Sequence, residues 1–193
     1  MPKIIADNQI FQAVINIIAE RGYSGATTRQ IAETAGVSEV TLFRKYGSKA
    51  DLVKRTIGSL VMQTGFQSAT IYTGNLQADL SRVLQAYKAS VVLYEHFFIA
   101  LFAEINRVSE LADSFSNALG LYHSIGKLLE QYQEEGVLRK ENVNHSVASL
   151  LGPLIYSSMI ARSAGNDFMP PLDIESHIQF FIQGRSRSME RQE

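Results

Sequence analysis

The sequence predicts an all-α protein, and three observations support this class. Apolar residues recur at spacings of three and four along most of the chain, as they do on one face of a helix. No segment shows the strict alternation of apolar and polar residues that marks a half-buried strand. Glycine, often beside serine or asparagine, separates the periodic stretches where helices would end. We therefore expect about nine helices.

The first helix is expected over residues 7–21. Ile10, Val14 and Ile18 recur at a spacing of four and form one apolar face, which would turn toward a core. Gly22 follows directly, and a glycine after the last periodic residue can adopt the left-handed conformation that ends many helices. A short connector then leads to the next element.

Two short helices follow across a tight turn. Thr27 and Gln30 have the spacing of a capping box, in which each side chain satisfies a backbone N–H of the other residue. Gly36 ends the helix that they begin, and Ser38 is placed to cap the next one. These two helices are expected over residues 27–35 and 38–46.

The remaining helices are longer. Ser48 and Asp51 form a second capping pair, and the helix that they begin is expected to run to about residue 69. Glycine and proline residues divide the rest of the chain. Further helices are expected over residues 76–94, 97–107, 113–135, 144–164 and 174–187.

Composition narrows the class of protein. The chain contains no cysteine, which excludes a disulfide scaffold and a thiolate metal site and favours a reducing compartment. Polar residues interrupt both the first apolar residues and the uncharged stretch 142–161, so we expect neither an export signal nor a membrane span. A cytoplasmic protein is the expectation.

Charge is distributed unevenly, although the whole chain is nearly neutral. Residues 1–58 hold eight basic and five acidic residues, a net charge of +3, and the remainder carries −4. A basic segment joined to an acidic one is typical of a nucleic-acid-binding module attached to a second domain.

Residues 28–46 have the pattern of a helix-turn-helix. Ala32 is small where two crossing helices would come closest, and Gly36 lies where the turn needs a positive φ. Ile31 and Leu42 supply apolar side chains for the packed side of the two helices. Other helical hairpins use glycine and alanine in the same way, so the pattern alone leaves that alternative open.

A longer pattern runs through this region, namely Gly25-x-Thr27-Thr28-Arg29-x-Ile31-Ala32, Gly36-Val37-Ser38 and Thr41-Leu42-Phe43-x-x-Tyr46-x-x-Lys49-x-x-Leu52. At these positions residues 7–60 resemble the DNA-binding domain of the TetR family of bacterial transcription regulators. The resemblance implies a three-helix DNA-binding head with a recognition helix over residues 38–46, and a homodimer built from the last two long helices. It divides the chain into a helix-turn-helix DNA-binding domain, 1–50, and a helical-bundle domain for ligand binding and dimerisation, 51–193.

Several side chains of the helix-turn-helix have the chemistry for DNA contacts. Arg29 suits guanine or a phosphate, and Thr41 offers a methyl group and a hydroxyl to a base edge. Glu39 is either a specificity residue that accepts from a cytosine amino group or a carboxylate that favours the start of a helix. Lys49 resembles the phosphate-anchoring lysine of the family. The full set of expected DNA contacts is Thr27, Thr28, Arg29, Ser38, Glu39, Val40, Thr41, Phe43, Arg44, Lys45 and Lys49.

The second domain is rich in aromatic residues, which either line a ligand pocket between helices or form ordinary core. The expected pocket residues are Phe66, Tyr87, Tyr94, Phe98, Phe102 and Tyr122. Small residues among apolar ones near the C-terminus favour close helix packing, either in a two-fold dimer interface or within one subunit. The expected interface residues are Leu151, Leu154, Ile155, Ile178, Phe181 and Ile182.

Together these features predict a sequence-specific DNA-binding regulator that a small apolar or amphipathic ligand releases from a palindromic double-stranded operator. The residues leave repression and activation both open, and the family resemblance implies a repressor. A DNA-binding architectural protein without a sensed ligand is the alternative, but the acidic second domain would then have no role. An enzyme is disfavoured because the chain lacks a nucleophile elbow and a glycine-rich phosphate loop. The four histidines are scattered, so neither a metal site nor a cofactor is expected.

Overall fold

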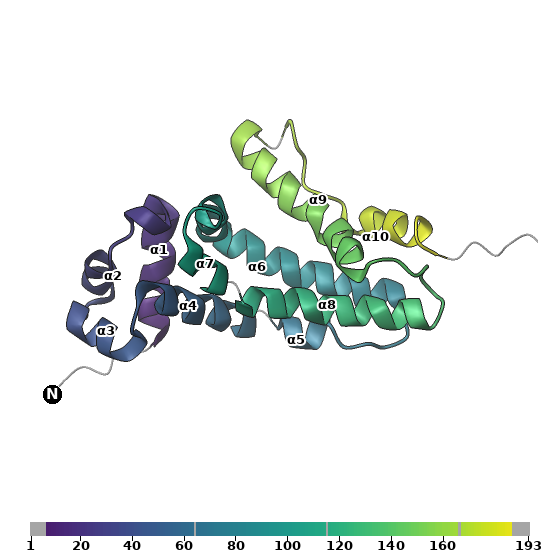
Figure 1. Ribbon diagram of the computed structural model, residues 1–193. Helices are drawn as coiled ribbons and strands as arrows, with labels where there is room; N and C mark the ends of the chain where they lie inside the picture. The colour runs from purple at the N-terminus through teal and green to yellow at the C-terminus, as the bar shows by residue number, and fades with distance from the viewer. Residues whose placement is uncertain (1–6, 64, 115, 166, 187–193) are drawn as a thin grey trace, which may run out of the picture. The chain divides into compact units, whose positions relative to one another are not determined.

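The computed structural model describes residues 7–63, 65–114, 116–165 and 167–186, and these residues form an all-α structure (Figure 1). Within them there are ten helices and no strand, and one isolated antiparallel bridge joins Leu138 to Ser186. The helices are α1 (Asp7–Gly25), α2 (Thr28–Ala35), α3 (Glu39–Tyr46), α4 (Lys49–Gln63), α5 (Phe66–Ala69), α6 (Leu76–Glu104), α7 (Ser109–Ser114), α8 (Ser116–Glu134), α9 (Val143–Ala164) and α10 (Ile174–Gln183). The predicted fold class is confirmed. None of the helices in the described ranges has, by itself, both the length and the apolar composition of a membrane-spanning segment, and the two parts of α6 reach them only in combination.

The chain forms two compact units, and neither is continuous in sequence. The first comprises the described residues of 1–63 and 93–119, and the second comprises those of 64–92 and 120–193. Helix α6 therefore contributes to both units. The sequence predicts two helices here, and the single α6 is indeed non-helical at Tyr94, with φ −122° and ψ 18°. The functional division of the chain into DNA-binding and sensing domains stays a prediction.

The core of the first unit is built from the apolar faces of α1 to α4. Ile18, Ile31 and Ile57 are completely buried in it. Phe97 of α6 and Leu111 of α7 are completely buried in the same core. Each fully buried aliphatic or phenyl side chain contributes about 1.5–3 kcal/mol to folding. The four N-terminal helices therefore depend for their stability on residues from much later in the chain.

Side-chain caps start α2 and α3 as the sequence predicts. In the capping box of α2, Thr27 Oγ1 accepts from the Gln30 N–H at 3.2 Å. Gln30 Oε1 accepts in turn from the Thr27 N–H at 3.1 Å. Ser38 Oγ accepts from the Thr41 N–H at 3.1 Å and so caps α3. Each cap is worth about 1 kcal/mol, which matters for helices only eight residues long.

Two stretches of helix differ from the expectation. The long helix predicted to residue 69 is divided into α4 and the four-residue α5. Helix α7 is not predicted, because its six residues make fewer than two turns and cannot show an apolar period. Its position is instead fixed by tertiary packing of Leu111 in the core of the first unit.

Gly22 has a backbone conformation that an alanine would strain, and this gives a testable prediction. Its φ of +72° and ψ of 171° lie in a region essentially restricted to glycine, and a Cβ would lie 2.6 Å from Glu104 Oε1. Gly36 is the matched control, because its φ of +68° and ψ of 31° are left-handed helical and a Cβ would meet no described atom within 4 Å. We expect Gly22→Ala to lower the free energy of unfolding by about 3 kcal/mol and Gly36→Ala by about 1 kcal/mol. Urea unfolding measures both losses, and equal losses would contradict the greater backbone strain expected at position 22.

The core of the second unit lies between the first part of α6 and helices α8, α9 and α10. Leu80, Leu129 and Leu150 are completely buried there, and Phe181 of α10 packs with them. The backbone N–H of Arg139 bonds to the Arg185 carbonyl at 2.8 Å, which joins the segment after α8 to the end of α10. All of these contacts lie within the second unit.

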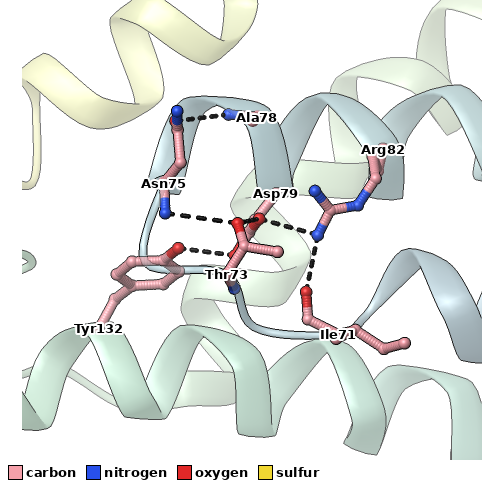
Figure 2. Close-up of polar contacts among 7 residues, drawn as sticks. All are labelled: Ile71, Thr73, Asn75, Ala78, Asp79, Arg82 and Tyr132. Atoms are coloured by element: carbon pink, nitrogen blue, oxygen red, sulfur yellow. Dashed lines mark hydrogen bonds and ion pairs between the residues drawn. The ribbon is translucent and has the colours of Figure 1, made fainter.

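A buried carboxylate ties the start of α6 to the segment before it and to α8 (Figure 2). Asp79 is fully buried and accepts from the Thr73 N–H at 2.9 Å and the Tyr132 hydroxyl at 2.6 Å, and the Thr73 hydroxyl also contacts it. Arg82 donates to Asp79 at 2.8 Å and to the Ile71 carbonyl at 2.7 Å. Burial alone would raise the pKa of Asp79, but the hydrogen bonds outweigh it and hold the pKa below its ordinary value. The charged carboxylate therefore fixes the segment before α6 against two helices.

Candidate nucleic-acid interface

A tight turn holds α3 against α2. The Gly36 N–H bonds to the Glu33 carbonyl at 3.1 Å. The Val37 N–H bonds to the Ala32 carbonyl at 2.9 Å, so the turn itself satisfies the end of α2. Ala32 and Leu42 are buried on the packed side of the two helices, as their residue types predict. The predicted helix-turn-helix is confirmed.

The outer face of α3 combines apolar and basic side chains. Val40 is 76% exposed and Phe43 is 47% exposed, whereas Tyr46 on the same helix is buried. Arg44 and Lys45 are exposed beside them. Exposed apolar groups suit thymine methyls and sugar rings, and exposed cations suit phosphates. This face therefore has the chemistry of a DNA-reading surface.

The small hydroxyl residues expected to contact DNA have partners within the protein. Thr27 belongs to the capping box of α2. The hydroxyls of Ser38 and Thr41 are 2.8 Å apart, and Ser38 caps α3. The first turns of α2 and α3 are thereby held in place by contacts within the protein. The predicted contacts of these three residues to DNA stay predictions.

Two carboxylates lie close to residues that the sequence assigns to DNA. The Thr28 hydroxyl donates to Glu39 Oε1 at 2.5 Å, which links the first residue of α2 to the first residue of α3. Arg29 Nε donates to Glu33 Oε1 at 3.0 Å. The Arg29–Glu33 pair is largely exposed, so it adds little to stability and leaves the other guanidinium nitrogens available to a guanine or a phosphate.

Lys45 and Tyr46 meet at the start of α1. The Lys45 ammonium contacts Asp7 Oδ1, and the Tyr46 hydroxyl donates to the same oxygen at 2.5 Å. The hydrogen bond from Lys45, followed by that from Tyr46, holds the pKa of Asp7 below its ordinary value. The Lys45–Asp7 pair is exposed, so a DNA phosphate can compete for the ammonium.

Lys49 has a structural role that the sequence does not predict. Its ammonium donates to the carbonyls of Tyr23 at 2.9 Å and Ala26 at 3.0 Å, and lies 4.1 Å from the centroid of the Tyr23 ring. Burial lowers the pKa of Lys49, and the charges of Glu110 and Glu104 offset part of that effect. The side chain thus ties the start of α4 to the connection between α1 and α2, and the predicted phosphate contact stays a prediction.

Two glutamates from late in the chain hold the same connection, and sequence reasoning missed both. Glu104 accepts from the Ser24 N–H at 3.0 Å and also contacts the Ser24 hydroxyl. The Tyr23 hydroxyl donates to Glu110 Oε1 at 2.5 Å. Burial alone would raise the pKa of Glu104, but its hydrogen bonds to Ser24 outweigh it and the pKa lies below its ordinary value. About 80 residues separate these partners, and no local motif in the sequence marks them.

The residues expected to line a ligand pocket fall in different units. Tyr87 and Tyr122 belong to the second unit, where a hydrogen bond links the side chain of the buried Tyr87 to that of Tyr122. Tyr94, Phe98 and Phe102 belong to the first unit, and Phe102 is 54% exposed. The side chain of Phe66 lies outside the described part of the structure. A single pocket lined by all six stays a prediction, and within one unit the structure brings Tyr87 and Tyr122 together.

Four residues expected at a dimer interface are buried within one chain. Leu151, Leu154, Ile178 and Phe181 lie in the core of the second unit. Ile155 and Ile182 are half-buried against the same core. Apolar periodicity reveals an apolar face but does not say whether that face covers its own subunit or a partner, so the contact of these six residues with a second subunit stays a prediction. The same two helices expose three other large apolar side chains, namely Tyr156, Met159 and Phe180.

Known proteins similar to this chain share its helix-turn-helix and its fold. Residues 10–56 match the family model described as "Bacterial regulatory proteins, tetR family". YvkB of Bacillus subtilis, described as an uncharacterized HTH-type transcriptional regulator, is 27% identical over 150 residues, which cover 70% of this chain and 72% of that protein. Rv1556 of Mycobacterium tuberculosis, with the same description, is 25% identical over 157 residues, which cover 80% and 76%. The solved structure of the TetR family transcriptional regulator PfmR from Thermus thermophilus has a TM-score of 0.61 at 19% identity, and the match covers 94% of this chain and 99% of that one.

Proposed function

The chain belongs to the TetR family of DNA-binding transcription regulators, and on that premise we propose that it is a dimeric repressor of a palindromic operator, released by a small apolar or amphipathic ligand. The observation that carries the proposal is the outer face of α3, where Val40 and Phe43 are exposed beside Arg44 and Lys45. A recognition helix uses apolar groups at base edges and basic groups at phosphates. Occupation of a promoter by such a helix would block transcription.

A dimer is proposed from the apolar side chains that α9 and α10 leave exposed. Tyr156 is 61% exposed on α9, Met159 lies one turn further along, and Phe180 is 71% exposed on α10. Aromatic and methionine side chains are enriched where subunits associate. A two-fold dimer would present two copies of α3 to successive major grooves, whose centres lie about 34–36 Å apart. The operator should therefore be palindromic.

A ligand site in the second unit is proposed around Tyr87 and Tyr122. Burial raises the pKa of both phenols, so both hydroxyls stay neutral and keep their hydrogen-bonding capacity. A few polar groups in an otherwise apolar setting are the usual means by which a small-molecule site orients its guest. Such a ligand would release the operator only if it bound the free and DNA-bound conformations with different affinity.

Selection of bound duplexes from a random pool tests this function. We expect the wild-type protein to select a two-fold symmetric sequence and to bind it as two chains per duplex. Arg44→Ala should weaken binding to all sequences alike and reduce the slope of log affinity against log salt concentration by about one, because one phosphate contact is lost. Lys127→Ala is the charge-matched control, since Lys127 is exposed on α8 in the second unit and should leave the slope unchanged.

Equal affinity for every duplex in this selection would contradict sequence-specific regulation.

A second experiment tests the ligand. Apolar and amphipathic compounds are screened for those that raise the melting temperature of the protein. If the stabilising compounds leave operator affinity unchanged, the release mechanism is contradicted and the architectural alternative is favoured.

A further inference from the structure

A carboxylate occupies the first position of α3, on a helix whose outer face is otherwise apolar and basic. Glu39 is half-buried, and its neighbour Val40 is 76% exposed. A negative charge close to DNA phosphates lowers affinity unless the carboxylate accepts a hydrogen bond from the DNA. A hydrogen bond from the DNA to this carboxylate would offset the repulsion and explain a glutamate at this position.

The alternative explanation, that Glu39 serves only to start the helix, is weakened by the contacts around it. Ser38 already caps α3 through the Thr41 N–H, so the helix does not need Glu39 as a cap. A carboxylate that acts only on the helix dipole also needs no fixed orientation. Glu39 is instead oriented, because Thr28 on α2 donates to its Oε1 at 2.5 Å. Among the described residues Thr28 is the one hydrogen-bond donor to this carboxylate, which leaves Oε2 as an acceptor for another group.

We propose that Glu39 reads a cytosine in each operator half-site through the N4 amino group, and that Thr28 is the residue that positions it. This inference rests on the proposed DNA-binding function. In the major groove cytosine presents an amino donor, whereas guanine and thymine present acceptor oxygens that a carboxylate repels. Adenine offers an amino group beside the N7 acceptor, so it suits a side-chain amide better than a carboxylate. The fixed carboxylate therefore selects against three of the four bases.

The chemistry makes a directional prediction for Glu39→Gln. Glutamine donates and accepts, so it can form the paired hydrogen bonds to adenine N6 and N7. Random-pool selection with wild type should return cytosine at one symmetric position, and selection with Glu39→Gln should return adenine there. We expect each protein to prefer its own base by on the order of 10- to 100-fold at that position. All other positions of the operator should be unchanged.

Thr28 is tested as a positioning residue by its own pair of variants. Thr28→Val removes the hydroxyl and should reduce the cytosine preference several-fold, with the preferences at other positions and the melting temperature preserved. Thr28→Ser keeps the hydroxyl and should restore the preference. Glu20→Gln is the charge control, because Glu20 is exposed on α1 and should alter no base preference.

The outcomes separate this inference from the proposed function. If wild type selects an operator and Glu39→Gln selects the same bases with higher affinity throughout, Glu39 contributes only repulsion and the inference is overturned while the function stands. If Thr28→Val keeps the full cytosine preference, the positioning role is overturned. If wild type selects no sequence at all, the proposed function itself fails.

Discussion

Asp79→Ala should lower the free energy of unfolding by about 4 kcal/mol. The substitution leaves the hydroxyl of Tyr132, a residue only 1% exposed, and the N–H of the exposed Thr73 without their acceptor. An unsatisfied buried group costs about 1–3 kcal/mol, so the larger share of the loss comes from Tyr132. The substitution also removes the partner of Arg82 in the network of Figure 2. Urea unfolding followed by circular dichroism measures the loss.

Asp79→Asn is the matched control, because asparagine has nearly the same shape and keeps an acceptor oxygen. It loses the charge opposite Arg82, whose side chain is 38% exposed, so we expect a loss of only about 1–2 kcal/mol. The folded pKa of Asp79 lies below its ordinary value of 3.8, so the contribution of its charge is complete above that pH and is lost as the pH falls through the folded pKa. The difference between wild type and Asp79→Asn should therefore shrink in acid. Equal losses from the alanine and asparagine variants would show that the acceptor oxygen is not what stabilises the second unit.

Lys49→Met should destabilise the first unit by about 3 kcal/mol. The ammonium donates hydrogen bonds to the carbonyls of Tyr23 and Ala26. A hydrogen bond from a charged group contributes about 1.5–3 kcal/mol. The ammonium also lies over the Tyr23 ring, a contact worth about 0.5–1 kcal/mol. Methionine keeps the apolar length of the side chain but none of these bonds. Chemical unfolding measures the loss of stability, and operator binding is measured at a temperature where the variant is folded.

Lys45→Met is the matched control, because it also removes one positive charge from the first unit. Comparing the two variants separates the effect of a lysine on stability from its effect on operator binding. The Lys45–Asp7 pair is exposed, so its loss should cost under about 1 kcal/mol of stability. Both variants should reduce the salt slope of operator binding by about one if both lysines contact phosphates. A Lys49→Met variant that unfolds like wild type but has lost operator affinity would contradict the structural role and leave only the phosphate contact.

Local sequence was sufficient to predict the helix-turn-helix. Its caps join residues three positions apart, as in Thr27 with Gln30 and Ser38 with Thr41, and its turn needs one glycine at Gly36. Such signals are short-range, so a single sequence reveals them. The same holds for the division of the chain into helices, except at the break between α4 and α5 and at α7, which is too short to show a period.

Contacts between residues far apart in the chain could not be predicted from the sequence. Nothing near Glu104 or Glu110 indicates that these carboxylates hold Ser24 and Tyr23. Likewise, Leu151 and Tyr156 both lie on an apolar helix, but only the packed structure shows that the first is core and the second is exposed. The outward residues of α3 could be predicted because the motif fixes their orientation. The aromatic residues of the later helices could not be assigned, because a pocket and a core use the same side chains.

The interrupted first unit has a consequence for the order in which this protein is made. Residues 1–63 are synthesised before residues 93–119, which supply Phe97 and Leu111 to the same core. At about 5–20 residues per second, the ribosome takes roughly 3–11 seconds to add residues 64–119, which end with the missing segment. During that interval the apolar sides of α1 and α4 lack part of their cover and offer a binding surface to chaperones. A chimera that transplants this head onto another regulator must therefore carry both segments, because the first 63 residues alone do not contain the whole core.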